Sequence, residues 1–148
     1  MRTTISREVE FDAGHRVPWH DSKCRNPHGH RYRVVIDVSG PVQHRIGESE
    51  HGMVLDFGRL KTLLVERVHD RYDHGFIVYE GDYELLACFT HGDAYWNVQV
   101  VSFVPTAENL AAAVFLDLEP EVKALAAGVQ LDSVTVFETP TCKAVVTR

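Results

Sequence analysis

Alternating apolar and polar residues mark the strands of this chain. From Arg31 to Val38 every second residue is large and apolar, which predicts a β-strand with one buried face. The stretch from Ile5 to Gly14 predicts an earlier strand that ends next to His15. Three later stretches also have strand character, at residues 96–104, 129–137 and 143–147.

Two other segments have the spacing of amphipathic helices. Asp56 is an expected N-cap, and the apolar residues after it recur on one helical stripe as far as about Tyr72. Thr106 is the expected N-cap of a second helix, which is predicted to kink or restart at Pro120 and to end before Gly128. Residues 83–89 are compatible with a short helix. The apolar stripe of the first helix consists of Phe57, Leu60, Leu63, Leu64 and Val68.

This order of elements predicts an α+β fold. We expect an antiparallel four-stranded sheet with two helices packed on one face, in a single domain spanning residues 1–148. A chain of this length can bury about two-thirds of its unfolded surface in one core. Because such a small open sheet leaves two edges unpaired, we also expect a homo-oligomer.

Composition narrows the class of protein. The formal net charge of −6 argues against binding to nucleic acid or to a membrane surface, because proteins that bind these anionic partners usually carry an excess of basic residues. Three cysteines at unrelated spacings argue against a disulfide framework and for a reducing compartment, and Cys88 and Cys142 are expected to be buried. The sequence shows neither an apolar leader nor an apolar run long enough to cross a bilayer, so we expect a cytoplasmic protein.

The clearest candidate chemistry is a group of histidines. His28 and His30 are two residues apart in a predicted strand, so their side chains project from the same face. A tight return between the first two strands would bring His15 beside them. Imidazoles suit zinc, copper, iron or nickel, and a set of three with one vacant position is the usual arrangement of catalytic zinc. We therefore expect zinc at His15, His28 and His30.

Other interpretations of the same region stay open. Cys24 lies shortly before His28, and as a fourth ligand it would close the site and make the zinc structural. The pair Asp73 and His74 follows the first helix, and Glu138 lies in phase with inward-facing residues of a closing strand. These acids are either solvated surface groups or members of a site, since an inward carboxylate is costly unless it is paired or used.

Short motifs along nearly the whole chain carry a resemblance to a known family. In their order they resemble the 6-pyruvoyl-tetrahydropterin synthase superfamily, and within it the bacterial 6-carboxytetrahydropterin synthases. The three-residue gap between Cys24 and His28 is similar to that of the carboxytetrahydropterin branch. The motifs are Phe11-x-Ala13-x-His15, Cys24-x-x-x-His28-Gly29-His30, Gly52-Met53-Val54-x-Asp56-Phe57, Asp73-His74, Pro105-Thr106-Ala107-Glu108-Asn109 and Glu138-Thr139.

The resemblance implies a zinc enzyme that acts on a small pterin. His15, His28 and His30 match the zinc ligands of the family, and Cys24 matches its catalytic base. The implied reaction converts 7,8-dihydroneopterin triphosphate into 6-carboxy-5,6,7,8-tetrahydropterin and releases acetaldehyde and triphosphate. In the bacterial branch this reaction belongs to the biosynthesis of queuosine and other deazapurines.

The resemblance also implies further site residues and an assembly. Asp73 and His74 match a relay that activates the cysteine, and Glu138 matches the residue that anchors the pterin ring and joins the relay. Thr106 and Glu108 are implied as further substrate contacts. The family fold is the tunnelling fold, in which subunits form trimeric barrels that pair into hexamers, with active sites at subunit contacts. We therefore expect a homo-oligomeric barrel, with a dimer of trimers as the implied stoichiometry.

Departures from the family pattern leave rival functions in view. The segment from Tyr79 to Asn97 is unusually long, and this puts the shape of the pocket in doubt. Lys23, Arg25 and Arg16 are near the cysteine motif, where they are either phosphate contacts or solvated surface charges. The rival functions are a pyruvoyl-forming synthase, or another pterin side-chain lyase, on the same site, and a non-enzymatic binding module stabilised by zinc.

Overall fold

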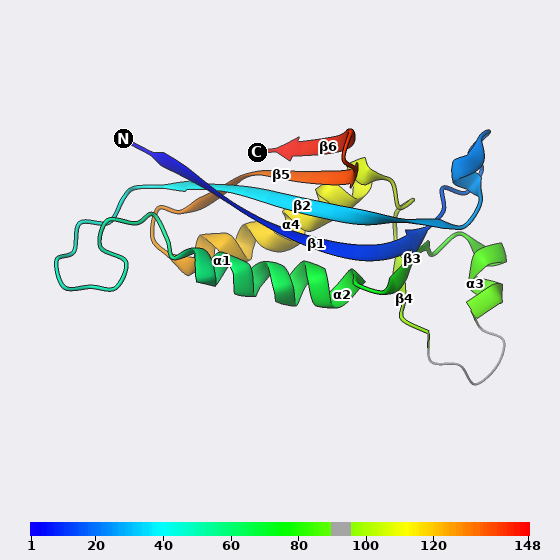
Figure 1. Cartoon of the computed structure of the whole chain (residues 1–148), viewed down its shortest axis with the longest axis horizontal. Coiled ribbons are helices and arrows are strands. Elements are labelled where there is room, and N and C mark those ends of the chain that lie inside the picture. Colours follow the sequence, from blue (N-terminus) through cyan, green and yellow to red (C-terminus); the bar gives the residue numbers. More distant parts are fainter. Residues whose placement is uncertain (90–95) are drawn as a thin grey trace.

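A computed structural model describes residues 1–89 and 96–148 of the chain. These residues form a six-stranded sheet in the order β4-β3-β1-β2-β5-β6 (Figure 1). The two longest strands, β1 and β2, form its centre. The strands are β1 (Thr3–His15), β2 (His28–Gly40), β3 (Gly75–Tyr79), β4 (Val98–Val101), β5 (Gln130–Thr139) and β6 (Cys142–Thr147).

The long helices cover one face of this sheet, whereas two short ones lie beyond the end of β1 (Figure 1). The covering layer is made by α4 and by a continuous run in which α1 passes through the π-helical turn η2 into α2. No helix among the described residues is long and apolar enough to cross a membrane. The helices are η1 (Lys23–Arg25), α1 (Phe57–Leu64), η2 (Val65–His69), α2 (Asp70–Tyr72), α3 (Tyr83–Phe89) and α4 (Ala107–Leu125).

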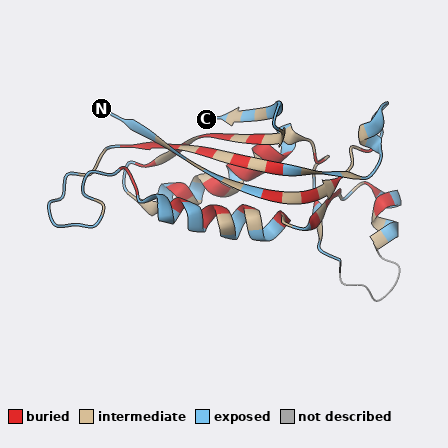
Figure 2. Cartoon of the chain, in the orientation of Figure 1, coloured by how far each residue is buried: buried red, intermediate tan, exposed pale blue. Residues whose placement is uncertain are grey.

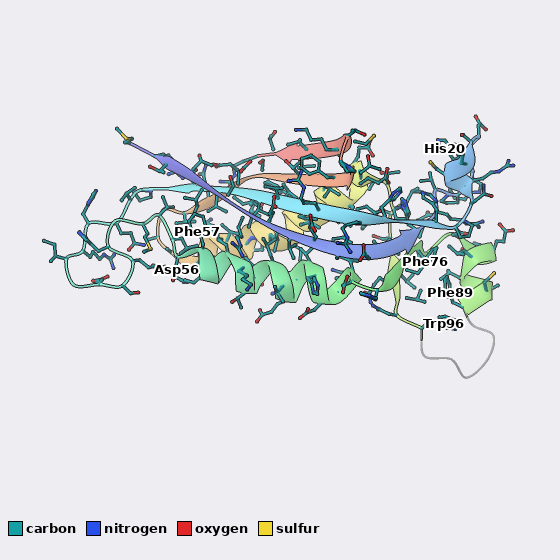
Figure 3. All side chains as sticks on the ribbon, viewed as in Figure 1. His20, Asp56, Phe57, Phe76, Phe89 and Trp96 are labelled. Atoms are coloured by element: carbon teal, nitrogen blue, oxygen red, sulfur yellow. The ribbon has the colours of Figure 1, made fainter. Side chains whose placement is uncertain are left out.

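Both N-caps that the sequence indicates are formed. Asp56 Oδ1 accepts a hydrogen bond of 2.6 Å from the Gly58 N–H at the start of α1, and Thr106 Oγ1 accepts one of 3.3 Å from the Asn109 N–H at the start of α4. Figure 3 shows Asp56 and Phe57 at the end of the molecule opposite to His20. Phe57 was expected in the buried stripe, but it is 50% exposed because it occupies the first position of the helix, where the chain has only begun to approach the sheet.

The hydrophobic core lies between the sheet and the covering helices. Buried positions alternate with partly buried ones along the central strands, as Figure 2 shows. Tyr32, Val34 and Ile36 of β2 are each at most 1% exposed, which confirms the predicted inner face of this strand. From the helical side, Leu60 and Leu118 are fully buried against them. The metal candidates His28 and His30 begin this same strand, so the core fixes their orientation.

The α+β class is confirmed, but the expected antiparallel four-stranded sheet is wrong. β3 pairs with β1 in parallel, and β4 pairs with β3 in parallel, so the sheet is mixed. Parallel neighbours need a crossover connection, which the run α1–α2 supplies before β3 and the segment containing α3 supplies before β4. The strand predicted over residues 96–104 is shorter, at Val98–Val101, and part of the long segment from Tyr79 to Asn97 lies outside the described residues.

The helix α4 runs through Pro120 instead of breaking there. Proline removes the hydrogen bond to the carbonyl four residues earlier, which belongs to Leu116. Leu116 is 70% exposed, so water can satisfy that carbonyl and the helix continues to Leu125. The helix therefore does not restart at Pro120.

Candidate functional site

Three histidines converge where β1 ends and β2 begins. The antiparallel register puts His15 opposite His28 and Ala13 opposite His30. One ring nitrogen from each of the three imidazoles lies within 4.8 Å of those of the other two. The ring centroids are 4.5 Å apart for His15 and His28 and 5.0 Å apart for His28 and His30. The three side chains can therefore hold one metal ion.

The connection between the two strands is longer than expected. The sequence suggested a tight return, but residues 16–27 form a loop that contains η1. Pairing along the whole of both strands sets the register, so His15 meets His28 without a tight turn. The loop presents Cys24 beside the histidines, with Val17 N–H donating a bond of 2.8 Å to the Cys24 carbonyl.

Backbone carbonyls orient two of the rings. His15 Nδ1 lies 2.6 Å from the Pro105 carbonyl oxygen, and His28 Nδ1 lies 2.7 Å from that of Asn26. Because a carbonyl can only accept, both Nδ1 atoms donate, and the Nε2 lone pairs are left for a metal. The buried Nε2 atoms of His15 and His30 have no hydrogen-bond partner among the described residues, as expected of atoms that bind a metal ion.

The surroundings of His15 and His30 favour their neutral forms. Burial lowers the pKa of His15 to about 4, although its hydrogen bond with the Pro105 carbonyl opposes this effect. Burial also lowers the pKa of His30, against the opposing charge of Glu138. Only the neutral form offers a lone pair, so the site is ready for a metal near neutral pH.

Glu138 points toward the histidines from β5. Its Oε1 atom lies 3.5 Å from His15 Nε2 and 3.8 Å from His30 Nε2. The carboxylate is on the inner side of the strand, as its phase with Val134 and Val136 predicted, and it faces polar partners there. It can stabilise a bound cation or accept hydrogen bonds from a ligand that enters beside it.

A cavity of about 220 Å³ opens against His15 and Glu138. Cys24, Thr106 and Glu108 also line it, so the structure brings together most of the residues singled out in the sequence. Sequence reasoning missed the remaining lining residues, because single residues in loops and at the ends of helices and strands carry no pattern. Those residues are Val17, His20, Ala107, Cys142 and Lys143, of which Cys142 is exposed and not buried as expected.

Asp73 and His74 do not join this cavity. Asp73 Oδ2 lies 2.7 Å from His74 Nδ1, and Asp73 Oδ1 accepts a bond of 3.0 Å from the Asp12 N–H. His74 lines a different cavity, together with His30 and Arg31. Its side chain is 82% exposed, and its backbone has a φ of 55°, a left-handed conformation that is uncommon outside glycine. In the single chain the pair is thus formed, with His74 exposed and Asp73 partly buried, and neither residue lines the cavity of Cys24.

The three basic residues near the cysteine motif have different surroundings. Arg16 forms ion pairs with Asp82 and Glu84. Arg25 lines a second, larger cavity that shares His20 with the first. Lys23 lies in η1, immediately before Cys24.

Comparisons with known sequences point in one direction. A family model described as 6-pyruvoyl tetrahydropterin synthase matches residues 4–148. A 6-carboxy-5,6,7,8-tetrahydropterin synthase of Rickettsia bellii is 34% identical over 144 residues, which cover 93% of this chain and 94% of the relative. The synthase of the same name from Haemophilus influenzae is 32% identical over 139 residues, with 93% of both chains covered. The one from Synechocystis is 36% identical over 141 residues, with 95% of this chain and 89% of the relative covered.

Solved structures agree on the fold. An uncharacterized protein from Wolinella succinogenes has a TM-score of 0.79 at 25% identity, with 100% of this chain and 99% of the other covered. The 6-pyruvoyl tetrahydropterin synthase of Caenorhabditis elegans has a TM-score of 0.67 at 25% identity, with 100% and 96% covered. Both likenesses extend over the whole chain, so they include the strands that carry the histidine cluster.

Proposed function

The chain belongs to the 6-pyruvoyl tetrahydropterin synthase family, and from this premise we propose that it is a zinc-dependent 6-carboxy-5,6,7,8-tetrahydropterin synthase. The substrate would be 7,8-dihydroneopterin triphosphate, and acetaldehyde and triphosphate would be released. One observation carries the proposal: three histidines converge beside a cavity that also presents Cys24 and Glu138.

The histidine cluster fits zinc by its chemistry. His15 and His30 have buried Nε2 atoms without a partner among the described residues, and the Nδ1 atoms of His15 and His28 are held by carbonyls. Three imidazoles are a familiar ligand set for zinc with one position left for substrate. When bound there, zinc supplies a Lewis acid that polarises the side-chain oxygens of the substrate and makes the neighbouring carbon-bound protons more acidic.

The residues of the cavity would divide the remaining work. Cys24 lines the cavity and would remove a carbon-bound proton, with the thiolate as its reactive form. Glu138 can accept hydrogen bonds from the amino group and ring N–H of a pterin, in a charge-assisted pair that fixes the ring. Thr106 and Glu108, at the start of α4, offer further polar contacts.

Assembly would complete the site. Asp73 and His74 do not line the cavity of Cys24 in the single chain, and His74 is exposed. We infer that a neighbouring subunit supplies this pair to the cysteine in a homo-oligomer. A mixture of Cys24→Ala and His74→Ala subunits would then recover activity, because some contacts combine an intact cysteine with an intact histidine. A mixture that stays inactive would contradict a shared site.

The closest rival is a pyruvoyl-forming synthase on the same residues, and the likeness to the Caenorhabditis elegans enzyme keeps it in view. Product identity separates the two. Zinc-loaded protein incubated with 7,8-dihydroneopterin triphosphate should give 6-carboxytetrahydropterin and acetaldehyde by mass spectrometry. Pyruvoyl-tetrahydropterin without acetaldehyde would favour the rival, and an unchanged substrate would contradict both.

A binding module stabilised by zinc is the rival from another class, with Cys24 as a fourth ligand. Under the proposed function, Cys24→Ala keeps its zinc and its assembly and loses turnover. Loss of zinc from this variant would instead favour a closed structural site.

A further inference from the structure

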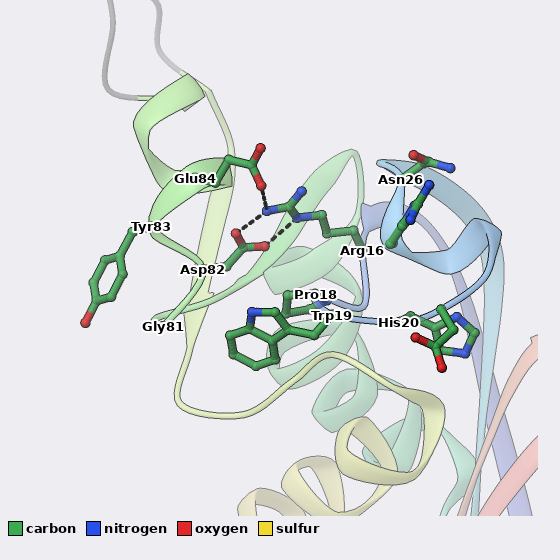
Figure 4. Close-up of a pocket in the computed structure, with 11 residues that line it drawn as sticks. Arg16, Pro18, Trp19, His20, Asn26, Gly81, Asp82, Tyr83 and Glu84 are labelled. Atoms are coloured by element: carbon green, nitrogen blue, oxygen red, sulfur yellow. Dashed lines mark hydrogen bonds and ion pairs between the residues drawn. The ribbon is translucent and has the colours of Figure 1, made fainter.

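A second cavity of about 770 Å³ adjoins the first one and shares His20 with it. Its walls come from the loop that follows β1 and from the start of α3, as Figure 4 shows. The helix α3 belongs to the segment whose length departs from the family pattern. Arg16 crosses from the loop to this segment and is the charged link between the two walls.

Arg16 binds the buried carboxylate of Asp82. Asp82 is 4% exposed, and its two oxygens accept bonds from Arg16, one of 2.6 Å from Nε and a second from Nη2. Hydrogen bonding to the Arg16 guanidinium holds the pKa of Asp82 below its ordinary value. Asp82 Oδ1 also accepts a bond of 3.1 Å from the Leu85 N–H in the first turn of α3. A fork of two bonds to one buried carboxylate holds the arginine in a single orientation.

Arg16 stands between the two functional parts of the loop. The residue before it is the metal candidate His15, and the residue after it is Val17, whose N–H holds the Cys24 carbonyl at 2.8 Å. A shift of the backbone at Arg16 would therefore displace Val17 relative to His15 and, through the bond from the Val17 N–H, would displace the backbone of Cys24.

We propose that Asp82 is a positioning residue: by clamping Arg16, it sets the placement of Cys24 relative to the histidine cluster. The α3 segment thereby serves the active site without touching the substrate. The catalytic side of this inference rests on the proposed function, whereas the placement of Cys24 can be measured without turnover.

The substitution Asp82→Asn separates this role from simple support of α3. Asparagine is as good an N-cap as aspartate, so it can keep the bond from the Leu85 N–H. Its side chain is uncharged and has one acceptor oxygen instead of two, so it cannot accept both guanidinium bonds. Glu84→Gln is the matched control. Glu84 also contacts Arg16, with 2.9 Å between Oε2 and Nη2, but its side chain is 84% exposed and contributes little to orientation.

We expect Asp82→Asn to keep its zinc content and its KM and to lose about tenfold in kcat, because small displacements of a reacting group are costly. Glu84→Gln should match the wild type. A wild-type kcat in Asp82→Asn would overturn the proposal. If Asp82→Asn does not fold, Arg16→Lys, which keeps the charge but loses the fork, should show the same loss of kcat at unchanged KM.

The readout without turnover is the alkylation of cysteines by iodoacetamide, followed peptide by peptide with mass spectrometry. In Asp82→Asn the rate at Cys24 should rise at least about threefold as the loop is released, while the rate at Cys88 on α3 stays constant. Equal changes at both cysteines would show that α3 has detached as a whole and would refute a positioning role. If wild-type protein does not convert the pterin, the proposed function fails, but this measurement still decides whether Asp82 places Cys24.

Discussion

The Nδ1 atom of His15 lies 2.6 Å from the carbonyl oxygen of Pro105, a residue 90 positions later in the chain. This bond joins the end of β1 to the residue before the N-cap of α4. The segment that begins α4 therefore also orients the imidazole of a metal candidate. Thr106, next to Pro105, lines the cavity on which His15 borders. The metal candidate and the substrate cavity are thus fixed by one local arrangement.

Removing one imidazole should remove the metal. We expect His28→Ala to lose at least about tenfold in zinc affinity, because three ligands are then reduced to two. Competition with a chromophoric chelator measures this change. His20→Ala is the control, since His20 borders the same cavity but lies outside the cluster, and it should keep the wild-type affinity.

The metal-free protein should lose stability in mild acid. The pKa of His15 is 6.5 in the unfolded chain and about 4 in the folded protein. Between these two pH values the unfolded chain therefore binds more protons than the folded one. The free energy of unfolding therefore falls as the pH is lowered through this window, by on the order of 3 kcal/mol for this residue. Urea denaturation across the window measures it. His15→Gln should flatten the dependence, and an unchanged slope in this variant would contradict the assignment.

Glu138→Gln should weaken pterin binding more than metal binding. A charge-assisted hydrogen bond contributes about 1.5–3 kcal/mol, so the Kd for 7,8-dihydroneopterin should rise about tenfold to a hundredfold. Calorimetric titration of the zinc-loaded protein measures this affinity. Glu10→Gln, an exposed acid on β1, serves as the control. Unchanged pterin affinity in Glu138→Gln would remove Glu138 as the anchor.

The cap of α1 should contribute measurably to stability. Asp56→Ala removes the acceptor of the Gly58 N–H and should cost about 1 kcal/mol in the free energy of unfolding. Asp56→Asn keeps an acceptor and should lose much less. Chemical denaturation of both variants gives the comparison, and equal losses would mean that the negative charge matters more than the cap.

The sequence predicted the parts of the fold that depend on regular spacing. The alternation through Tyr32, Val34 and Ile36 located β2 and its inner face, and the N-caps at Asp56 and Thr106 located both long helices. The strand β3 could not be found in this way, and for β4 the sequence indicated a strand but not its parallel pairing. They are short, and their pairing depends on crossover connections instead of on a local pattern.

The candidate site was predictable to a similar extent. His28 and His30 share a strand face by spacing alone, whereas the place of His15 depends on the register of two whole strands. The Pro105 carbonyl escapes sequence reasoning because every residue carries the same acceptor. Asp82 escapes it as well, because an aspartate in a loop is usually solvated and only the fold reveals that this one is buried.

X-ray absorption at the zinc edge of the wild-type protein tests the account most directly. We predict three imidazole nitrogens at about 2.0–2.1 Å, one further oxygen, and no sulfur. A permanent sulfur at about 2.3 Å would make Cys24 a ligand and would contradict the open site on which the proposed chemistry depends.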